Sequence, residues 1–190
     1  LAKLGKLANE DTNSWDGYLK AHRSRRSFFK EMGATASDHG HPSARTENLS
    51  NTDAEQLFKR ILAEDFNSEE ADQFRGQMLT EMAKMSCEDG LVMQIHPGSR
   101  RNHSEKIFNK FGLDKGFDIP GRTDYVSALK PLLDEVGLRT DLTIILFTLD
   151  ETSYSRELAP LAGVYPALKL GPPWWFFDSY EGMKRFREST

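Results

Sequence analysis

Residues 90–103 read GLVMQIHPGSRRNH and contain the clearest core strand of the chain. Residues 91–96 are almost continuously apolar, which is typical of a parallel-sheet strand that is buried on both faces. The strand ends on His96, and the loop that follows it carries Arg100 and Arg101. Functional groups of α/β proteins gather at the carboxyl ends of the strands, so this histidine is a candidate site residue.

Strand and helix candidates alternate along the chain. Helices are predicted over residues 14–32, 52–65, 68–89, 123–137 and 153–163, and from residue 179 onward; strands are predicted at residues 34–37, 91–96 and 142–150 and within 165–178. This alternation predicts βα units and an α/β fold. The pattern leaves two architectures open, a doubly wound sheet and a piece of a (β/α)8 barrel. A glycine-rich dinucleotide-binding turn follows none of the strands.

Composition narrows the classes of partner and compartment. The chain has 190 residues and a formal net charge of -4, which gives no support for nucleic acid binding. No apolar run approaches the roughly 20 residues of a membrane span, so no membrane partner is expected. Cys87 is the single cysteine. It excludes an internal disulfide and favours a reducing, cytoplasmic compartment. A start without Met and an end within a helical pattern lead us to expect a fragment.

Polar and aromatic side chains stand at the end of every predicted strand. If the strands are parallel neighbours, these side chains meet at one rim and suit a small, anionic, hydroxylated substrate, because arginine grips carboxylates and aromatic rings pack on sugars. In strand order the groups are Asp38, His39 and His41; His96 with Arg100, Arg101 and His103; Asp150 and Glu151; and Trp174, Trp175 and Asp178.

Each group also has a structural interpretation. His96 could be a core histidine bonded to backbone. His39 and His41 form an H-x-H pair that would put both rings on one side of an extended strand and suit a divalent metal. The glycine and proline around them equally favour a hydrogen-bonded turn. Trp174 and Trp175 could be packing residues, and Asp150 could cap the helix that follows it.

Four motifs, in this order, resemble the uronate isomerases (glucuronate isomerases) of the amidohydrolase superfamily. They are SDHG at residues 37–40, MQIHPGSRRNH at 93–103, GFDIP at 116–120 and GPPWWFFDSYEGM at 171–183. Residues 148–163, TLDETSYSRELAPLAG, resemble one branch of that family. The resemblance runs over essentially all 190 residues.

The resemblance implies a fold and an activity. Residues 1–190 are expected to form a single incomplete domain, the middle-to-late part of a (β/α)8 TIM-like barrel with about four βα units. The implied activity is aldose–ketose isomerisation of D-glucuronate to D-fructuronate, and of D-galacturonate to D-tagaturonate, in hexuronate catabolism. The implied cofactor is one divalent metal, Zn or Mn, and the implied partner is a small sugar acid. A homo-oligomer is left open.

The resemblance also implies roles for particular residues. His96 and Asp38 are the expected catalytic residues, and Arg156, Trp174 and Trp175 are expected to bind the substrate. Arg101 is also an expected substrate-binding residue, because arginine grips a carboxylate. The family's metal ligands, an H-x-H and an Asp, are expected outside this chain, with His96 near the metal. The chain by itself is therefore expected to be inactive. Two other interpretations stay open, a metal-dependent hydrolase of the same superfamily and a non-catalytic fragment.

Overall fold

A parallel sheet of four strands organises the chain, and the computed structural model describes residues 1–189. The sheet contains β1 (Ala36–His41), β2 (Val92–Pro97), β5 (Ile144–Phe147) and β6 (Leu168–Gly171). The strands lie in the order β1-β2-β5-β6, which is their order along the chain, and each neighbouring pair is parallel. A doubly wound sheet reverses its strand order at a switch point, whereas barrel strands follow one another. The chain is therefore part of a (β/α)8 barrel.

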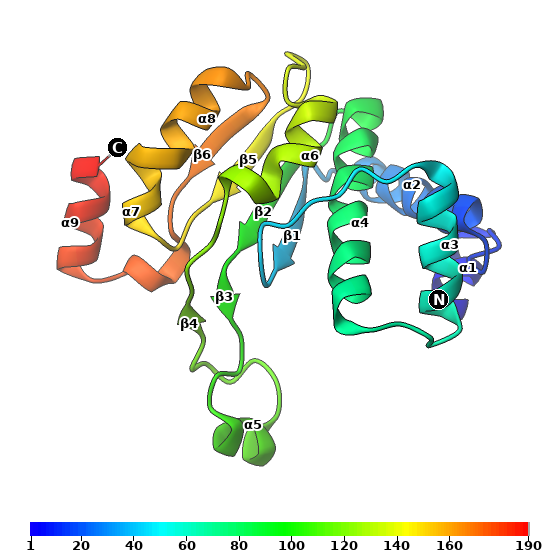
Figure 1. Cartoon of the computed structure of the whole chain (residues 1–190), viewed down its shortest axis with the longest axis horizontal. Coiled ribbons are helices and arrows are strands. Elements are labelled where there is room, and N and C mark those ends of the chain that lie inside the picture. The colour runs from blue at the N-terminus through cyan, green and yellow to red at the C-terminus, as the bar shows by residue number, and fades with distance from the viewer. Residues whose placement is uncertain (190) are drawn as a thin grey trace.

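Helices fill the connections between these strands (Figure 1). Within residues 1–189, no helix is long and apolar enough to cross a membrane. In chain order the helical elements are α1 (Ala2–Ala8), α2 (Trp15–Glu31), α3 (Asn51–Leu62), α4 (Ser68–Asp89), α5 (Glu105–Phe111), α6 (Val126–Val136), α7 (Glu151–Ser153), the π-helical turn η1 (Tyr154–Leu158), α8 (Ala159–Val164), the 3-10 turn η2 (Trp174–Phe177) and α9 (Tyr180–Ser189).

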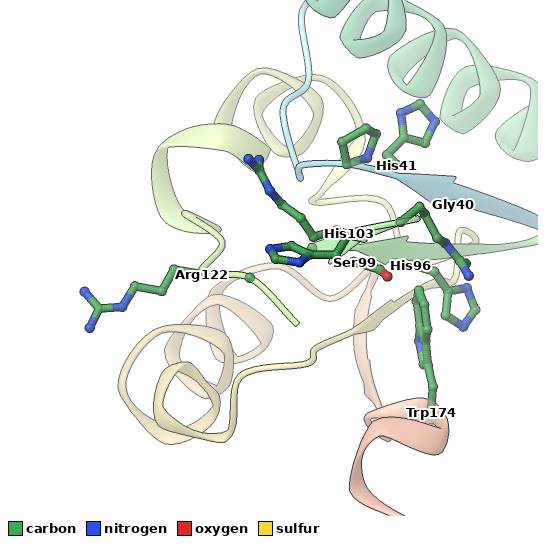
Figure 2. A pocket seen from close by; sticks show the side chains of 12 residues that line it. Gly40, His41, His96, Ser99, His103, Arg122 and Trp174 are labelled. Carbon is green, nitrogen blue, oxygen red and sulfur yellow. The ribbon is translucent and has the colours of Figure 1, made fainter. Parts of the chain in front are cut away.

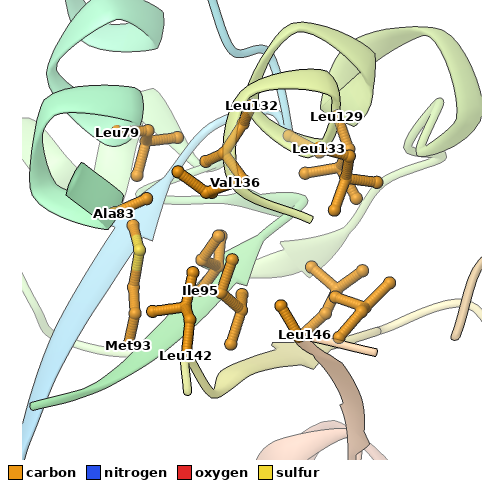
Figure 3. Close-up of a cluster of buried hydrophobic side chains, with 14 of the residues drawn as sticks. Leu79, Ala83, Met93, Ile95, Leu129, Leu132, Leu133, Val136, Leu142 and Leu146 are labelled. Carbon is orange, nitrogen blue, oxygen red and sulfur yellow. The ribbon is translucent and has the colours of Figure 1, made fainter. Parts of the chain in front are cut away.

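One face of the sheet packs against α4 and α6 and forms the main core (Figure 3). Ile95 of β2 and Leu146 of β5 are 0% exposed there. They belong to one buried cluster with Leu79 of α4 and Leu132 of α6. Burying an aliphatic side chain of this size contributes about 1.5–3 kcal/mol, so this face holds the sheet and its helices together.

The other face of the sheet is only half-buried, which corrects the prediction that both faces are covered. Gln94, His96, Ile145 and Phe147 occupy the strand positions between the core residues and are each partly exposed. In a (β/α)8 barrel the helices cover the outer face, and the inner face meets side chains from the other barrel strands. The half-buried face is the barrel interior.

A second apolar cluster joins α2, α3 and α4 beside the sheet. Trp15 and Phe58 are 4% and 1% exposed, and their ring centroids lie 5.5 Å apart. Tyr18 stacks on Phe58 at 5.0 Å. Aromatic pairs of this kind contribute about 0.5–1.5 kcal/mol beyond their buried area, so these helices form a stable unit on the outside of the sheet.

Most of the predicted loop 97–122 forms a projecting arm, residues 99–120 (Figure 1). At its base β3 (Ser99–Arg100) and β4 (Ile119–Pro120) pair antiparallel, with Ser99 opposite Pro120. The helix α5 lies at the far end of the arm, and none of its residues is buried. Hydrophobic periodicity does not predict such an arm, because strands of two residues contain no repeat.

Two predicted elements differ in extent from the structure. β1 continues through Asp38 and His39 to His41, so the segment is extended and the alternative of a turn is wrong. The helix predicted over residues 153–163 is divided into α7, η1 and α8. Pro160 stands at the start of α8. Its ring nitrogen has no hydrogen to donate, so the regular helical ladder is interrupted there.

Arg26 links α2 to the end of α4 through a nearly buried ion pair. Its Nε donates to Asp89 Oδ2 at 2.6 Å, and its Nη2 donates to Asp89 Oδ1 at 2.9 Å. Nη2 also donates to Ser86 Oγ at 2.9 Å. The Arg26 side chain is 8% exposed. Arg23, on the same helix, makes a similar two-bond pair with Glu88, but its side chain is 39% exposed.

We expect Arg26→Met to lower the free energy of unfolding by about 3 kcal/mol, because it leaves a partly buried carboxylate without its partner. Arg23→Met is the matched control and is expected to cost less than about 1 kcal/mol, since its pair is exposed to solvent. Urea unfolding of the 190-residue chain, followed by circular dichroism, measures both. Equal losses in the two variants would contradict the assignment of the larger contribution to burial.

Candidate active site at the strand ends

Asp38 and His96 form a hydrogen-bonded pair on the half-buried face of the sheet. Between β1 and β2, Asp38 lies opposite Gln94 and Gly40 lies opposite His96, so Asp38 and His96 project to the same side. His96 Nδ1 is bonded to Asp38 Oδ1. The His96 side chain is 17% exposed, whereas that of Asp38 is 63% exposed. A carboxylate on one ring nitrogen orients an imidazole and leaves the other nitrogen, Nε2, for a ligand.

Two aromatic rings flank the imidazole of His96. The Phe147 ring stacks on it with centroids 3.9 Å apart and an interplanar angle of 15°. The Trp174 ring lies 4.4 Å away at 60°, and Figure 2 shows it beside His96. Trp174 has a φ of 55°, in the left-handed region that non-glycine residues seldom adopt. The turn after β6 therefore holds this indole against the histidine through an uncommon backbone conformation.

Arg101 reaches the same group of rings from the arm. Its guanidinium carbon lies 5.8 Å from the ring centroid of Trp174 and 5.7 Å from that of Trp175. Its Nη1 donates to Asp118 Oδ2 at 2.7 Å, and the amide of Asn102 donates to the other Asp118 oxygen at 3.0 Å. Asp118 therefore joins the two sides of the arm and holds Arg101 over the indoles.

Gly98 turns the chain from β2 into the arm. Its φ is 91°, and a Cβ at this position would lie 2.4 Å from Thr123 Oγ1, so only glycine fits. Its amide donates to the His41 carbonyl at 3.3 Å, and its carbonyl accepts from the Gly121 amide at 2.8 Å. These two bonds join β1, β2 and the returning end of the arm beside the site.

Two cavities, of about 890 Å³ and about 400 Å³, meet around this group (Figure 2). His96, Gly40, Arg101 and Trp174 line both of them. The smaller cavity is also lined by Asp38, Gln94, Phe147, Pro172 and Trp175, and the larger one by His41, Pro42, Gly98, Ser99, Arg100, His103, Gly121 and Arg122. The imidazole of His96 therefore lies where the cavity that contains Asp38 joins a larger, basic cavity.

The larger cavity has the chemistry of an anion site. Arg100, Arg101 and Arg122 line it, although Figure 2 shows Arg122 extending away from His96. Among the described residues that line it, none is Asp or Glu. Ser99 Oγ and Trp174 Nε1 are buried without a hydrogen-bond partner in the described part of the chain. Because buried polar atoms are normally paired, these two are left for a partner that the described residues do not supply.

The H-x-H pair lies on the opposite face of β1. His39 pairs in register with Ile95, a core residue, and His41 pairs with Pro97. The two rings therefore share one side of the strand, as alternation predicts, but not the side of Asp38. His39 Nε2 and Ser37 Oγ lie 3.1 Å apart. Burial, and then the proximity of His41 and Arg26, lower the pKa of His39 to about 4.

The described residues do not by themselves form a metal centre. Within residues 1–189, no three His, Cys, Asp or Glu side chains lie close enough together to hold one ion. His39 bonds to a serine, and His96 Nδ1 is taken by Asp38. The described residues therefore do not supply a complete set of metal ligands, although a carboxylate on Nδ1 leaves His96 Nε2 able to bind one ion.

The structure brings together five of the six residues predicted for the site. Asp38, His96, Arg101, Trp174 and Trp175 line the two cavities. Arg156 does not: it lies in η1 with its side chain 69% exposed and pairs with Glu157. Asp150 caps α7, because its Oδ1 accepts from the Thr152 amide at 3.0 Å.

Sequence patterns do not identify several residues that line the site. Phe147 sits in an apolar run in which every residue has the appearance of core, and Gln94 likewise lies inside β2. The one signal for Gln94 and Phe147 is alternation along the strands, which places both side chains on the same face of the sheet as His96. Gly98 and Gly121 act through backbone geometry and carry no side-chain signal.

Comparison with protein families matches residues 1–189 to the glucuronate isomerase family model. The chain is 69% identical to a uronate isomerase of Mesorhizobium japonicum over 190 residues. This alignment covers 100% of this chain and 40% of that protein. The chain therefore spans about 40% of the length of the curated relatives that it matches.

Two solved structures have the same fold over this segment. The crystal structure of glucuronate isomerase from Caulobacter crescentus matches with a TM-score of 0.95 and 61% identity, over 99% of this chain and 39% of that one. A uronate isomerase from Thermotoga maritima matches with a TM-score of 0.89 and 29% identity, over 98% of this chain and 41% of that one.

We expect the stability of the chain to fall on acidification through His39. The unfolded histidine takes up a proton near pH 6.5, whereas the folded one resists protonation until pH falls to about 4. The unfolded state thus binds more protons in this window, so stability is complete above pH 6.5 and declines below it. The difference corresponds to at most about 3 kcal/mol. Urea unfolding from pH 7 to pH 4.5 should show a smaller decline in His39→Gln, and an unchanged decline would refute this assignment.

Proposed function

The chain belongs to the glucuronate isomerase family, and from this premise we propose that the whole protein interconverts uronate aldoses and ketoses. The substrates in this proposal are D-glucuronate, which yields D-fructuronate, and D-galacturonate, which yields D-tagaturonate, in hexuronate catabolism. This chain would contribute one part of the substrate site, around His96.

The observation that carries the proposal is the meeting of an acid–base pair and an anion-binding cavity at one imidazole. The Asp38–His96 pair suits proton movement at an oxygen, because imidazole is the side chain most often used as a general acid or base. The arginines of the larger cavity suit a carboxylate. A uronate carries a carbonyl at one end and a carboxylate at the other, so one molecule would occupy both cavities.

The chemistry requires a proton to leave C2 of the hydroxyaldehyde and a proton to arrive at C1. In our proposal, His96 Nε2 hydrogen-bonds the substrate oxygen on which negative charge develops in the enediolate. Asp38 holds the ring in the tautomer that presents this nitrogen. Arg101 binds the carboxylate, while Trp174 and Trp175 pack on the sugar. The base that removes the C2 proton would come from another part of the whole protein.

We also propose that the whole protein holds a divalent metal, Zn or Mn, as a member of the amidohydrolase superfamily. The reason to assign a full set of ligands to other parts of the protein is that no three His, Cys, Asp or Glu side chains gather among residues 1–189. The roles of Asp38, His96 and Arg101 described above do not depend on it.

The remaining partners follow from the proposed substrate. We propose a cytoplasmic protein whose partner is a small-molecule sugar acid rather than nucleic acid or membrane, in keeping with the net charge of -4 and the single cysteine. A homo-oligomer stays open, because the edges of β1 and β6 would pair with the other strands of the barrel rather than with a second copy.

The whole protein is expected to convert D-glucuronate to a ketose, and His96→Ala should lower kcat/KM by at least about 100-fold, since it removes the acid–base group. Asp38→Asn should lower it in the same direction by disturbing the imidazole tautomer. Proton NMR of the sugar follows the conversion. The 190-residue chain alone should give no turnover. Full activity in His96→Ala would remove this residue from the mechanism, and cleavage of an ester or amide with glucuronate untouched would favour a hydrolase.

Two arginine variants test the carboxylate contact. Arg101→Ala in the whole protein should raise KM by about tenfold or more, because hydrogen bonds to a charged group contribute about 1.5–3 kcal/mol. Arg156→Ala should change KM less than about twofold, since this exposed side chain pairs with Glu157 away from the cavities. The opposite ranking would assign the carboxylate to Arg156, as the family resemblance implies.

A further inference from the structure

His96 and Phe147 are the middle two of four residues that form a row across the inner face of the sheet. Gly40 pairs with His96 across β1 and β2, and Phe147 pairs with Gly171 across β5 and β6. Between them, Ile95 pairs with Leu146, which brings His96 and Phe147 side by side at the next position. Two rings are therefore flanked by two glycines at the carboxyl ends of the strands.

The stack on Phe147 restricts a motion of the His96 ring that its hydrogen bond to the Asp38 carboxylate leaves free. A hydrogen bond to Nδ1 fixes one atom of the imidazole, but the ring can still tilt about that bond. The centroids of the Phe147 and His96 rings lie 3.9 Å apart with an interplanar angle of 15°, and stacked aromatic pairs restrict the mutual orientation of their rings.

Gly171 makes this placement of Phe147 sterically accessible. A Cβ on Gly171 would lie 2.7 Å from both Cδ1 and Cε1 of Phe147 and 3.0 Å from Cγ2 of Ile145. Contacts this short do not occur between real atoms, so a methyl group here would force the Phe147 ring out of its place. Gly171 is buried in β6, which leaves little room for the strand to retreat.

We propose that Phe147 is a positioning residue that sets the plane of His96, and that Gly171 is required to seat it. The inference rests on the proposed function, because the plane of His96 determines where Nε2 points relative to the substrate oxygen. Phe147 carries no group that can donate, accept or transfer a proton. Phe147 also lines the smaller cavity, so a direct role in binding the substrate would change KM, whereas a role through His96 changes kcat. Misplacing a catalytic group by about 1 Å can cost about 100-fold in rate.

The test compares kcat and KM for glucuronate in the whole protein. Phe147→Leu should lower kcat at least about tenfold and leave KM within about twofold, because it frees His96 without removing a substrate-binding group. Phe147→Tyr keeps a flat ring and should restore most of kcat. Phe58→Leu removes the same ring atoms from the helical cluster and is the matched control, with kcat expected within about twofold. A rise in KM alone, or an unchanged kcat, in Phe147→Leu would overturn the inference.

Gly171→Ala supplies a second, independent test of the inference. Alone it should lower kcat at least about fivefold, whereas added to Phe147→Leu it should change kcat less than about twofold, because leucine lacks the ring atoms that the new methyl would meet. Additive losses in the double variant would show that Gly171 acts by another route and would overturn its assigned role.

A measurement without turnover separates this inference from the proposed function. In protein labelled with 13C-histidine, the ring protons of His96, assigned by their loss in His96→Ala, lie over the Phe147 ring and should shift upfield through its ring current. That shift should disappear in Phe147→Leu and diminish in Gly171→Ala. If the unaltered protein does not isomerise glucuronate, the proposed function fails. The His96 resonance still tests whether Phe147 stacks on His96, and an unmoved signal in Phe147→Leu overturns the inference.

Discussion

The parallel register of β1, β2, β5 and β6 is the constraint on which the rest of the structure depends. It places Ile95 and Leu146 against the helices and His96 and Phe147 on the barrel interior. Because strand side chains alternate, a slip of one residue in β2 would exchange Ile95 for His96. The buried contacts of the outer face therefore hold the polar residues of the inner face in place, and neither face can change its register alone.

The two roles that we propose for the site, at a substrate oxygen and at the substrate carboxylate, would fall to residues on two different parts of the chain. Asp38 and His96 stand on strands whose backbone bonds continue across the sheet. Arg100 and Arg101 stand on the arm, which holds its place through Gly98, Gly121 and the Asp118 carboxylate. In the proposed function a donor to a developing negative charge requires a fixed direction, and the planar guanidinium fork matches a carboxylate. This division matches the demands of each task.

The surroundings of His96 combine a polar contact with two apolar ones. The carboxylate of Asp38 determines which ring nitrogen is occupied, and the rings of Phe147 and Trp174 bound the imidazole on its flanks. Aromatic neighbours restrict orientation without adding a competing acid or base. The absence of a side chain at Gly171 is as much a part of this arrangement as the ring it admits.

The sequence by itself determined the α/β class, the main helices and the strand that ends at His96, because periodicity and chain breakers act over a few residues. It also determined that polar groups would gather at the strand ends. Only the tertiary structure decided that Asp38 faces the cavity while its neighbour His39 faces the helices, that Arg101 reaches the site while Arg156 does not, and that Phe147 lies on His96. Each of these outcomes depends on pairing between segments far apart in the chain, and a local pattern carries no information about which partner a strand will meet.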